Sequence, residues 1–519
     1  MTAIHSPAAA PSDREGARER ILDAVIIGAG YGGLGAAAQL TRAGFRDFAI
    51  LERADRIGGV WRDNTYPGAA CDTQSVIYCY TYFPHLEATR MYSEQPELLG
   101  YLEALATEFE LVDRIRFDSE AIRAEWNDDA ALWEVATKSG ERFRSRILVP
   151  AWGQLGTPHI PEFPGLDRFE GRAFHSAEWD HRIDLSGLSV ASIGNAASAV
   201  QYVPEVAKEA GYLGVFQRSA NYLFPRGQEV FSAERRAEFR EHPETFEAMR
   251  REIHEMREAG FERVRHATAA QSAGVADAMA HLERQIVDPE LRARLTPDYE
   301  FGCKRILRSD DYYPALNRDS VELITEGIAE FTPEGIRTAD GRERRFDVVI
   351  FGTGFRSQAF HAGMAVVGLG GVTLDERWGD APEAYFGMSV DGFPNMFMVF
   401  GPNTNLNHNS IVTMMEVQHE FIVESLRRLH GIRRPVLDVR ADAVAEHNDY
   451  VQGELQRSAY SSDCSSWYKN AAGRVVNNWY GTVEEYRSAV AAIEPKAFGL
   501  PDWPERATGD GADPSAAPR

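Results

Sequence analysis

The chain has 519 residues, of which 44% are hydrophobic, 26% charged and 11% aromatic. This balance is typical of a folded protein rather than a disordered or fibrous one, and the length predicts about two to four domains. The formal net charge of −23 argues against nucleic acid and anionic membranes as partners, because both select for basic surfaces.

The sequence shows no targeting or metal-binding signal. No apolar run reaches the roughly 18 residues that cross a bilayer, and no apolar block is followed by a cleavage site, so we expect a cytoplasmic location. The cysteines have no close paired spacing of the zinc or redox type. We therefore expect no metal site, and we expect four reduced, non-catalytic cysteines: Cys71, Cys79, Cys303 and Cys464.

The first predicted unit is a βαβ unit. An apolar strand beginning at Ala24 is followed by a glycine turn, an Ala- and Leu-rich helix and a second strand. Gly28, Gly30 and Gly33 would supply the tight turn, the close approach to a pyrophosphate and the close packing of helix on strand. Glu52 ends the second strand, where a carboxylate binds ribose hydroxyls and repels a 2′-phosphate. The unit is therefore predicted to bind FAD.

A second glycine turn follows directly, in RADRIGGVW. Gly59 in this turn would allow another close approach of the backbone to a flat ligand, although an ordinary loop is the alternative. Trp61, and Trp479 near the end of the chain, are candidates to stack on flavin or nicotinamide. A place in the hydrophobic core is the alternative for both tryptophans.

The middle of the chain contains a second βαβ pattern, with the turn GNAASA. Gly194 keeps the tight turn and Ser198 is a candidate cofactor contact, but Ala196 places a methyl group where the pyrophosphate would approach. Arg218 ends the following strand, at the place that Glu52 has in the first unit, and a cation there suits a 2′-phosphate. This unit is predicted to bind NADP, with a surface arginine as the alternative reading of Arg218.

The expected fold class is α/β, with two Rossmann-like dinucleotide-binding domains, for FAD and NADP, and a helical insert. The insert is rich in Glu, Arg, Ala, His and Met, and the apolar strand RFDVVIFGTGF follows it. The expected boundaries are 1–20 and 506–519 for flexible tails, 21–155 with 385–505 for the FAD domain, 156–224 with 325–384 for the NADP domain, and 225–324 for the insert.

Two dinucleotide units of opposite charge preference suggest hydride transfer from NADPH to a bound flavin. A disulfide reductase would use the same two units together with a close cysteine pair. Cys71 and Cys79 are separated by seven residues, which is the wrong spacing for that chemistry.

Between the two glycine turns lies FEGRAFHSAEWD, which has the pattern FxGxxxHxxxW at Phe169, Gly171, His175 and Trp179. Here the chain resembles the Baeyer–Villiger monooxygenases, flavoproteins that insert oxygen beside a ketone, and related flavin N- and S-oxygenases carry a looser version of the motif. The resemblance covers most of the chain and includes YPGAACD, DYEFGCKRILRSDDYYPALNRD, FGTGF, GPNTNLNHNS and SWYKNAAGRVVNNWYG. The motif lies in the linker between the domains, so a hinge role is favoured over a general-base role for His175.

The resemblance implies roles for individual residues. Asp72 and Arg305 match an aspartate and an arginine that shape the family's active site. Arg305 would stabilise an anionic flavin C4a-peroxide and the oxyanion of its ketone adduct, and Asp72 would orient Arg305. Lys304 would contact the 2′-phosphate or diphosphate of NADP, and a structural ion pair is the alternative for Arg305. Trp152 and Tyr480 depart from the family pattern, which puts the NADP fit and the local turn near Trp479 in doubt.

The implied function is an FAD- and NADPH-dependent Baeyer–Villiger monooxygenase that uses O2 to convert a ketone into an ester or lactone. One alternative is a flavin monooxygenase that oxidises nitrogen or sulfur with a protonated peroxide, and another is a non-catalytic nucleotide-sensing module. A fixed cation stabilises an anionic peroxide and does little for a neutral one, so Asp72 and Arg305 favour the first reading. The sequence does not specify the ketone or the oligomeric state.

Overall fold

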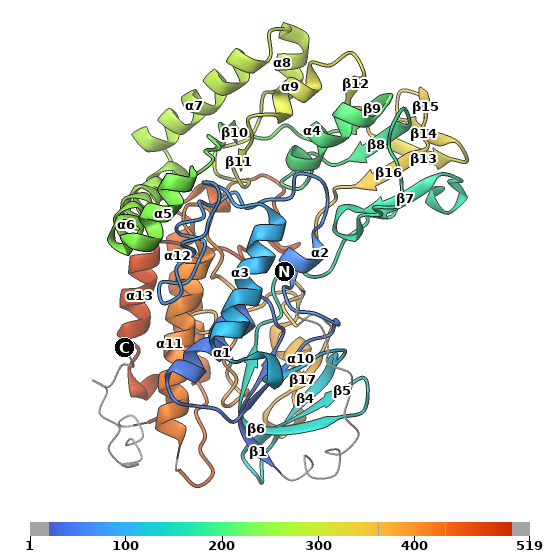
Figure 1. Cartoon of the computed structure of the whole chain (residues 1–519). Helices are drawn as coiled ribbons and strands as arrows, with labels where there is room; N and C mark the ends of the chain where they lie inside the picture. Colours follow the sequence, from blue (N-terminus) through green and yellow to red (C-terminus); the bar gives the residue numbers. More distant parts are fainter. Residues whose placement is uncertain (1–19, 362, 431, 501–519) are drawn as a thin grey trace.

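The computed structural model describes residues 20–361, 363–430 and 432–500, so apart from Arg20 the two expected tails lie outside the described residues (Figure 1). The two larger sheets lie at opposite ends of the view, and the helices of the insert, coloured green to yellow, lie at its upper and middle left. No helix in the described ranges is long and apolar enough to cross a membrane.

The N-terminal sheet has seven strands in the order β17-β4-β5-β6-β1-β2-β3. β1 pairs in parallel with β2 and β6, whereas β5 is antiparallel to both of its neighbours. The strands are β1 (Ile21–Ile27), β2 (Phe48–Leu51), β3 (Ile115–Arg116), β4 (Ala121–Asn127), β5 (Leu132–Thr137), β6 (Arg142–Pro150) and β17 (Ala365–Val367). The helices of this half are α1 (Tyr31–Arg42), α2 (Val60–Asp63), α3 (Gln95–Glu108), α10 (Leu374–Trp378), α11 (Ile411–Leu429), α12 (Ala441–Leu455) and α13 (Val483–Ala491).

The second sheet has five strands, all parallel, in the order β12-β9-β8-β16-β7. They are β7 (Arg172–His175), β8 (Ser189–Ile193), β9 (Tyr212–Phe216), β12 (Val321–Ile324) and β16 (Val348–Phe351), with α4 (Ala199–Glu209) joining β8 to β9. An antiparallel sheet of β13 (Ile328–Thr332), β14 (Gly335–Thr338) and β15 (Glu343–Arg345) follows β12 along the chain. The predicted α/β class with two Rossmann-like units is confirmed.

The helical insert shares the hydrophobic cores of both halves. It contains α5 (Ala233–Glu241), α6 (Pro243–Ala259), α7 (Ala269–Gln285), α8 (Pro289–Leu295) and α9 (Tyr312–Leu316), together with the short parallel pair β10 (Leu223–Phe224) and β11 (Leu307–Arg308). Phe239 and Phe246 are buried in the core of the N-terminal half. Leu282 and Tyr312 are buried in the core of the second half. The insert therefore connects the two halves through buried apolar side chains.

The strand pairing corrects two of the expected domain boundaries. β12 lies within the bounds expected for the insert, but it pairs with β9 in the second sheet. β17 lies within the bounds expected for the NADP domain, but it pairs with β4 in the N-terminal sheet. Short strands that join a sheet at its edge carry little periodicity of their own, so their partner is decided by the tertiary structure.

The glycine turns of the two units have the same geometry. Gly28 and Gly194 have φ angles of +102° and +106°, which L side chains rarely adopt. A Cβ on Gly28 would lie 2.7 Å from the carbonyl oxygen of Ala151, and one on Gly194 would lie 2.4 Å from that of Gly352. Gly33 packs more tightly still, because its Cβ would lie 1.9 Å from the Gly28 carbonyl oxygen. The third glycine therefore has the predicted packing role.

Gly33→Ala is expected to lower the free energy of unfolding by about 1–3 kcal/mol, because the new methyl group overlaps a backbone oxygen that cannot move without opening the turn. The matched control is Gly453→Ala in α12, which meets no atom within 4 Å and should raise stability by up to about 1 kcal/mol through helix propensity. Urea unfolding of both variants measures the difference. Equal stability of the two would contradict the packing role of Gly33.

Candidate active site

Both glycine turns open onto one cavity of about 1000 Å³. Most of the candidate residues line it: Gly28, Gly30, Glu52, Gly59, Trp61, Asp72, Gly194, Ser198, Arg218, Lys304 and Arg305. The structure does not bring Gly33, Trp479 or the motif residues Phe169, Gly171, His175 and Trp179 to its surface. No group of three or more His, Cys, Asp or Glu side chains that could hold a metal ion occurs within the described ranges.

The first turn leaves the start of α1 free for an anion. Gly30 is the N-cap of α1, no side chain caps the helix, and its first turn contains no acidic residue. Gly59 packs against Gly30, since a Cβ on Gly59 would lie 3.3 Å from the Gly30 Cα. Unpaired N–H groups at a helix N-terminus, approached by backbone alone, form a site for a pyrophosphate.

Glu52 is almost fully buried at the end of β2. One carboxylate oxygen accepts from the Ala29 N–H at 2.9 Å. The other accepts from the Ala54 N–H at 3.0 Å and from Arg62 Nη1 at 2.8 Å. A carboxylate accepts up to about four hydrogen bonds, so Glu52 orders the glycine turn and retains capacity for a ribose hydroxyl.

The second turn repeats this arrangement at α4. Ser198 is the N-cap, makes no side-chain cap, and precedes a first helical turn without acidic residues. Ala196 also lines the cavity, so its methyl group does face the space that the second cofactor would occupy.

Two cations meet beyond the end of β9. Arg218 is exposed, and Lys304 donates from Nζ to Ser219 Oγ at 2.7 Å. Burial lowers the pKa of Lys304, and the nearby charge of Arg218 lowers it further. Two cations that repel each other in this way are a suitable site for a dianionic phosphate.

Asp72 and Arg305 form the central ion pair of the cavity. Arg305 Nη2 lies 2.6 Å from Asp72 Oδ2 and 2.7 Å from Oδ1, and Arg305 Nε donates to Oδ2 at 3.1 Å. Burial acts to raise the pKa of Asp72, but the charge and hydrogen bonds of Arg305, together with the charges of Arg257 and Arg308, lower it below its ordinary value. Asp72 in turn raises the pKa of Arg305. Both groups are therefore ionised and held in one geometry.

Further arginines hold the turn that carries Asp72, and no sequence pattern marks them as part of the site. Arg257 of α6 donates to Gln74 Oε1 from Nε at 2.9 Å, and its Nη2 lies 3.4 Å from the Asp72 carbonyl oxygen. Arg226 donates to the Cys71 carbonyl oxygen at 3.0 Å. Burial lowers the pKa of Arg257 to about 10. These contacts pair residues more than 150 positions apart, so no local pattern could reveal them.

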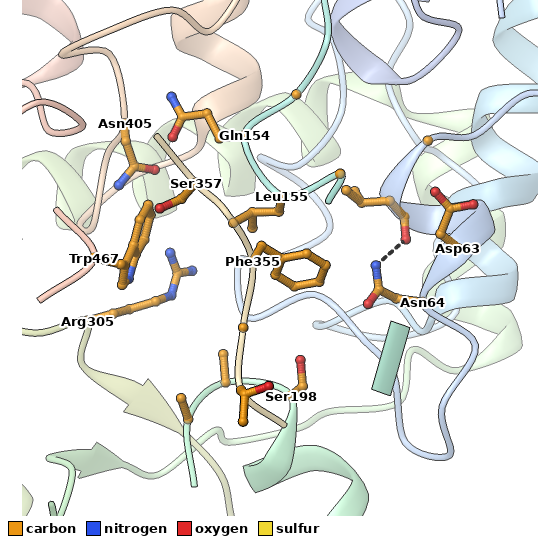
Figure 2. Close-up of a pocket in the computed structure, with 18 of the residues that line it drawn as sticks. Asp63, Asn64, Gln154, Leu155, Ser198, Arg305, Phe355, Ser357, Asn405 and Trp467 are labelled. Atoms are coloured by element: carbon orange, nitrogen blue, oxygen red, sulfur yellow. Dashed lines mark hydrogen bonds between the residues drawn. The ribbon is translucent and has the colours of Figure 1, made fainter. Parts of the chain in front are cut away.

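The wall near Arg305 is built by residues from several distant segments (Figure 2). In the close-up, Arg305 lies beside Trp467, and Leu155 and Phe355 lie next to each other across the space. The cavity is also lined by Trp152, Gln154, Ser357 and Asn405. Two buried polar atoms here, Trp152 Nε1 and Gln154 Oε1, have no partner in the described part of the protein. Trp152, which departs from the family pattern, thus lies in the cavity.

The motif residues lie outside the cavity, and His175 contacts a side chain that lines it. His175 is fully buried at the end of β7, its Nδ1 accepts from the Ala177 N–H at 3.1 Å, and its ring packs against Phe355, which lines the cavity. Burial lowers the pKa of His175, which favours the neutral form of the ring. Trp179 packs on Tyr202. Phe169 packs on Phe331 of β13, and a Cβ on Gly171 would meet the Phe169 ring and the carbonyl oxygen of Asp347.

The two candidate stacking tryptophans differ in place. Trp61 lines the cavity and donates to Tyr78 Oη at 3.2 Å. Trp479 is 1% exposed, donates to the Thr482 carbonyl oxygen and packs against Tyr486, so it lies in the hydrophobic core, the alternative reading, and does not line the cavity. Trp467, twelve residues earlier, lines the cavity instead. Aromatic residues in an irregular segment give no period from which their direction could be predicted.

The expectation that all four cysteines are reduced is wrong. Cys303 and Cys464 form a disulfide, with their Cα atoms 6.3 Å apart, whereas Cys71 and Cys79 are free and buried. The bonded cysteines are 161 positions apart, so sequence spacing could not indicate the pair.

Comparisons with known proteins identify the family. Residues 22–231 match the model of the family described as flavin-binding monooxygenase-like. The chain is 40% identical over 474 residues to a Baeyer–Villiger monooxygenase of Streptomyces coelicolor, covering 90% of this chain and 91% of that protein, and 37% identical to one of Pseudomonas aeruginosa, covering 92% and 91%. Among solved structures, an oxidized steroid monooxygenase bound to NADP matches with a TM-score of 0.82 at 31% identity, and a closed cyclohexanone monooxygenase with 0.80 at 29%, each covering 91% of this chain and 97% of the other. With its two dinucleotide units and its Asp72–Arg305 pair in one cavity, the chain belongs to the Baeyer–Villiger monooxygenase family.

Proposed function

We propose that the chain is an FAD- and NADPH-dependent Baeyer–Villiger monooxygenase that inserts one oxygen atom of O2 beside the carbonyl of a ketone, giving an ester or lactone. The observation that carries this proposal is the Asp72–Arg305 pair, bidentate and facing a cavity that both glycine turns share. A sensing module would need the turns but not this pair.

The residues of the two turns fit the two cofactors. FAD would lie with its pyrophosphate on the uncapped start of α1 at Gly30 and its ribose at Glu52. NADPH would lie with its pyrophosphate near Ser198 and its 2′-phosphate between Arg218 and Lys304. The unpartnered Trp152 Nε1 and Gln154 Oε1 are a donor and an acceptor left for a bound group.

FAD, once reduced by NADPH, supplies the activated oxygen, and the protein supplies the charge that steers it. Arg305 presents a permanent, planar cation where negative charge develops on the carbonyl oxygen as it is attacked. Asp72 accepts hydrogen bonds from Nε and Nη2 and so holds the guanidinium in place. Nη1 has no hydrogen-bond partner among the described residues and can donate to a bound group.

The same charge decides between the two enzymatic readings. Oxidation of nitrogen or sulfur needs a neutral, electrophilic oxygen donor, which a fixed cation does not favour. Attack on a carbonyl needs an anionic oxygen nucleophile, which Arg305 stabilises. Oxidation of nitrogen or sulfur is therefore the second candidate.

The proposed partners are a ketone with an apolar body and O2. Leu155, Phe355 and Trp467 give the wall near Arg305 an apolar character. Nucleic acid and anionic membranes are not proposed as partners, because the net charge of −23 opposes both. We propose the cytoplasm as the location.

Purified protein given NADPH, O2 and a panel of linear, cyclic and aromatic ketones is expected to form esters or lactones, measured by mass spectrometry. Arg305→Ala should lower ester formation by about 10²- to 10³-fold, the scale for loss of one preorganised donor to an oxyanion, while anaerobic reduction of the flavin by NADPH stays measurable. Arg305→Lys, which keeps the charge without the bidentate pair, should fall between. Sulfoxide or N-oxide without ester would favour the second candidate, and full ester yield from Arg305→Ala would contradict the role of Arg305.

Arg218→Ala is expected to raise KM for NADPH about 10- to 100-fold and to leave KM for NADH nearly unchanged, because a charge-assisted hydrogen bond to phosphate is worth about 1.5–3 kcal/mol. Arg182→Ala, an exposed arginine outside the cavity, is the matched control and should change neither value.

The preference for NADPH over NADH should fall as the pH rises. The pKa of Lys304 lies below the usual 10.5, so Lys304 loses its charge at a lower pH than an ordinary lysine, while Arg218 stays charged. Lys304→Met should abolish this pH dependence. Steady-state kinetics with both nucleotides between neutral and alkaline pH measure it, and an unchanged pH dependence in Lys304→Met would contradict the assignment.

A further inference from the structure

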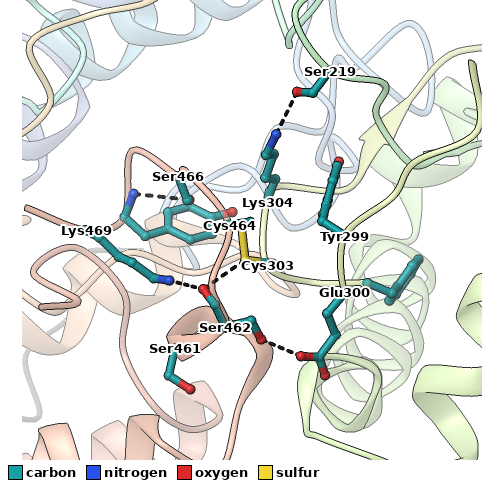
Figure 3. Close-up of a disulfide and its surroundings, with 12 residues drawn as sticks. Ser219, Tyr299, Glu300, Cys303, Lys304, Ser461, Ser462, Cys464, Ser466 and Lys469 are labelled. Atoms are coloured by element: carbon teal, nitrogen blue, oxygen red, sulfur yellow. Dashed lines mark hydrogen bonds between the residues drawn. A yellow bond between two sulfur atoms is a disulfide. The ribbon is translucent and has the colours of Figure 1, made fainter. Parts of the chain in front are cut away.

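The Cys303–Cys464 disulfide joins two segments that each carry cavity-lining residues (Figure 3). Cys303 directly precedes Lys304 and Arg305. Cys464 directly precedes Ser465, Ser466 and Trp467, all of which line the cavity. The disulfide therefore links the part of the cavity wall that carries Lys304 and Arg305 to the part that carries Trp467. The place where these two parts meet is called the junction below.

The segment that carries Cys464 has little buried surface: none of residues 461–467, all of which the structure describes, is buried. Residues 461–466 read SSDCSS, so Cys464 is the one member of this stretch that is neither Ser nor Asp. The nearest buried side chains are those of Tyr460 and Tyr468, one on each side of the segment. Small polar side chains gain little from packing, so the disulfide supplies what burial does not.

The remaining contacts across the junction are polar and partly exposed. Glu300 accepts from Ser462 Oγ and lies 2.7 Å from His266 Nδ1, and His266 Nε2 lies 3.3 Å from Ser461 Oγ. The side chains of His266 and Glu300 are 35% and 33% exposed. Exposed polar pairs of this kind contribute little to stability.

We propose that the disulfide is a positioning element of the active site: it holds residues 461–467 against Lys304 and Arg305, and its reduction by a thiol loosens this wall. The inference rests on the proposed function, since it assigns the wall to NADP and ketone binding. It also predicts that the enzyme responds to redox conditions, because disulfides in a reducing cytoplasm are rare and are usually redox-sensitive.

The chemistry of opening balances with two equivalents of a small thiol. A thiolate attacks Cys464 Sγ, which is the accessible sulfur because Cys303 is fully buried, and the Cys303 thiolate leaves and takes up a proton. A second thiolate attacks the small-thiol sulfur of the mixed disulfide, and the Cys464 thiolate leaves and takes up a proton. The protein gains two thiols and the two small thiols become one disulfide, so two electrons and two protons are transferred.

The test compares untreated and dithiothreitol-treated FAD-loaded protein. Non-reducing peptide mapping should find the peptides of Cys303 and Cys464 linked, with Cys71 and Cys79 as free thiols. Reduction should increase hydrogen–deuterium exchange in residues 461–467 and leave β1 and α1 unchanged. It should also weaken NADP⁺ binding, measured by calorimetry, by about tenfold through loss of a preorganised wall.

Two variants separate the disulfide from general effects of thiol treatment. Cys303→Ser/Cys464→Ser should resemble the reduced protein with or without dithiothreitol, whereas Cys79→Ala, which removes a free buried cysteine, should respond as the wild type does. If the double variant does not fold, reduction of the wild type followed by reoxidation gives the same comparison.

The outcomes distinguish the two proposals. Free thiols at all four cysteines in untreated protein, or unchanged exchange and NADP⁺ affinity after reduction, would overturn the positioning role. Ester formation is measured separately, so its failure with every ketone would count against the proposed function while a change in exchange and affinity would still support the positioning role.

Discussion

The ion pair of Asp72 and Arg305 joins a loop of the N-terminal half to a segment that returns from the helical insert. The two side chains are only partly buried, with 30% of Arg305 and 25% of Asp72 exposed, and the bidentate contact satisfies each charge with the other. Because Asp72 accepts hydrogen bonds from both Nε and Nη2 of Arg305, the guanidinium is held in one position. A cavity built around a fixed cation is suited to chemistry in which negative charge appears on oxygen.

The insert makes this pair possible. Its first helices bury Phe239 and Phe246 in the N-terminal core, and its later part buries Leu282 and Tyr312 in the second core. The chain that carries Arg305 is therefore held by both halves. Polar contacts from Arg257 and Arg226 to the backbone around Asp72 add a further set of constraints from the same insert. The insert is thus part of the frame that holds the active site.

The parts of the site that were predictable are those in which a few neighbouring residues carry the whole constraint. Gly28, Gly33 and Gly194 occupy backbone positions that a side chain would obstruct, and this requirement is local. Arg305 and Asp72 were found through the family resemblance, not through any pattern of their own. The place of Trp479 stayed open because an irregular segment gives no indication of which aromatic ring faces a cavity and which faces the core.

The sequence by itself determined the two βαβ units, their charges at Glu52 and Arg218, and the α/β class, because hydrophobic period and glycine spacing act over about 30 residues. Only the tertiary structure decided the partners of β12 and β17, the contacts of Arg257, the cavity position of Trp467 and the Cys303–Cys464 bond. Each of these joins residues far apart in the chain. Such pairings depend on how the cores pack, and packing is a property of the whole fold rather than of any one segment.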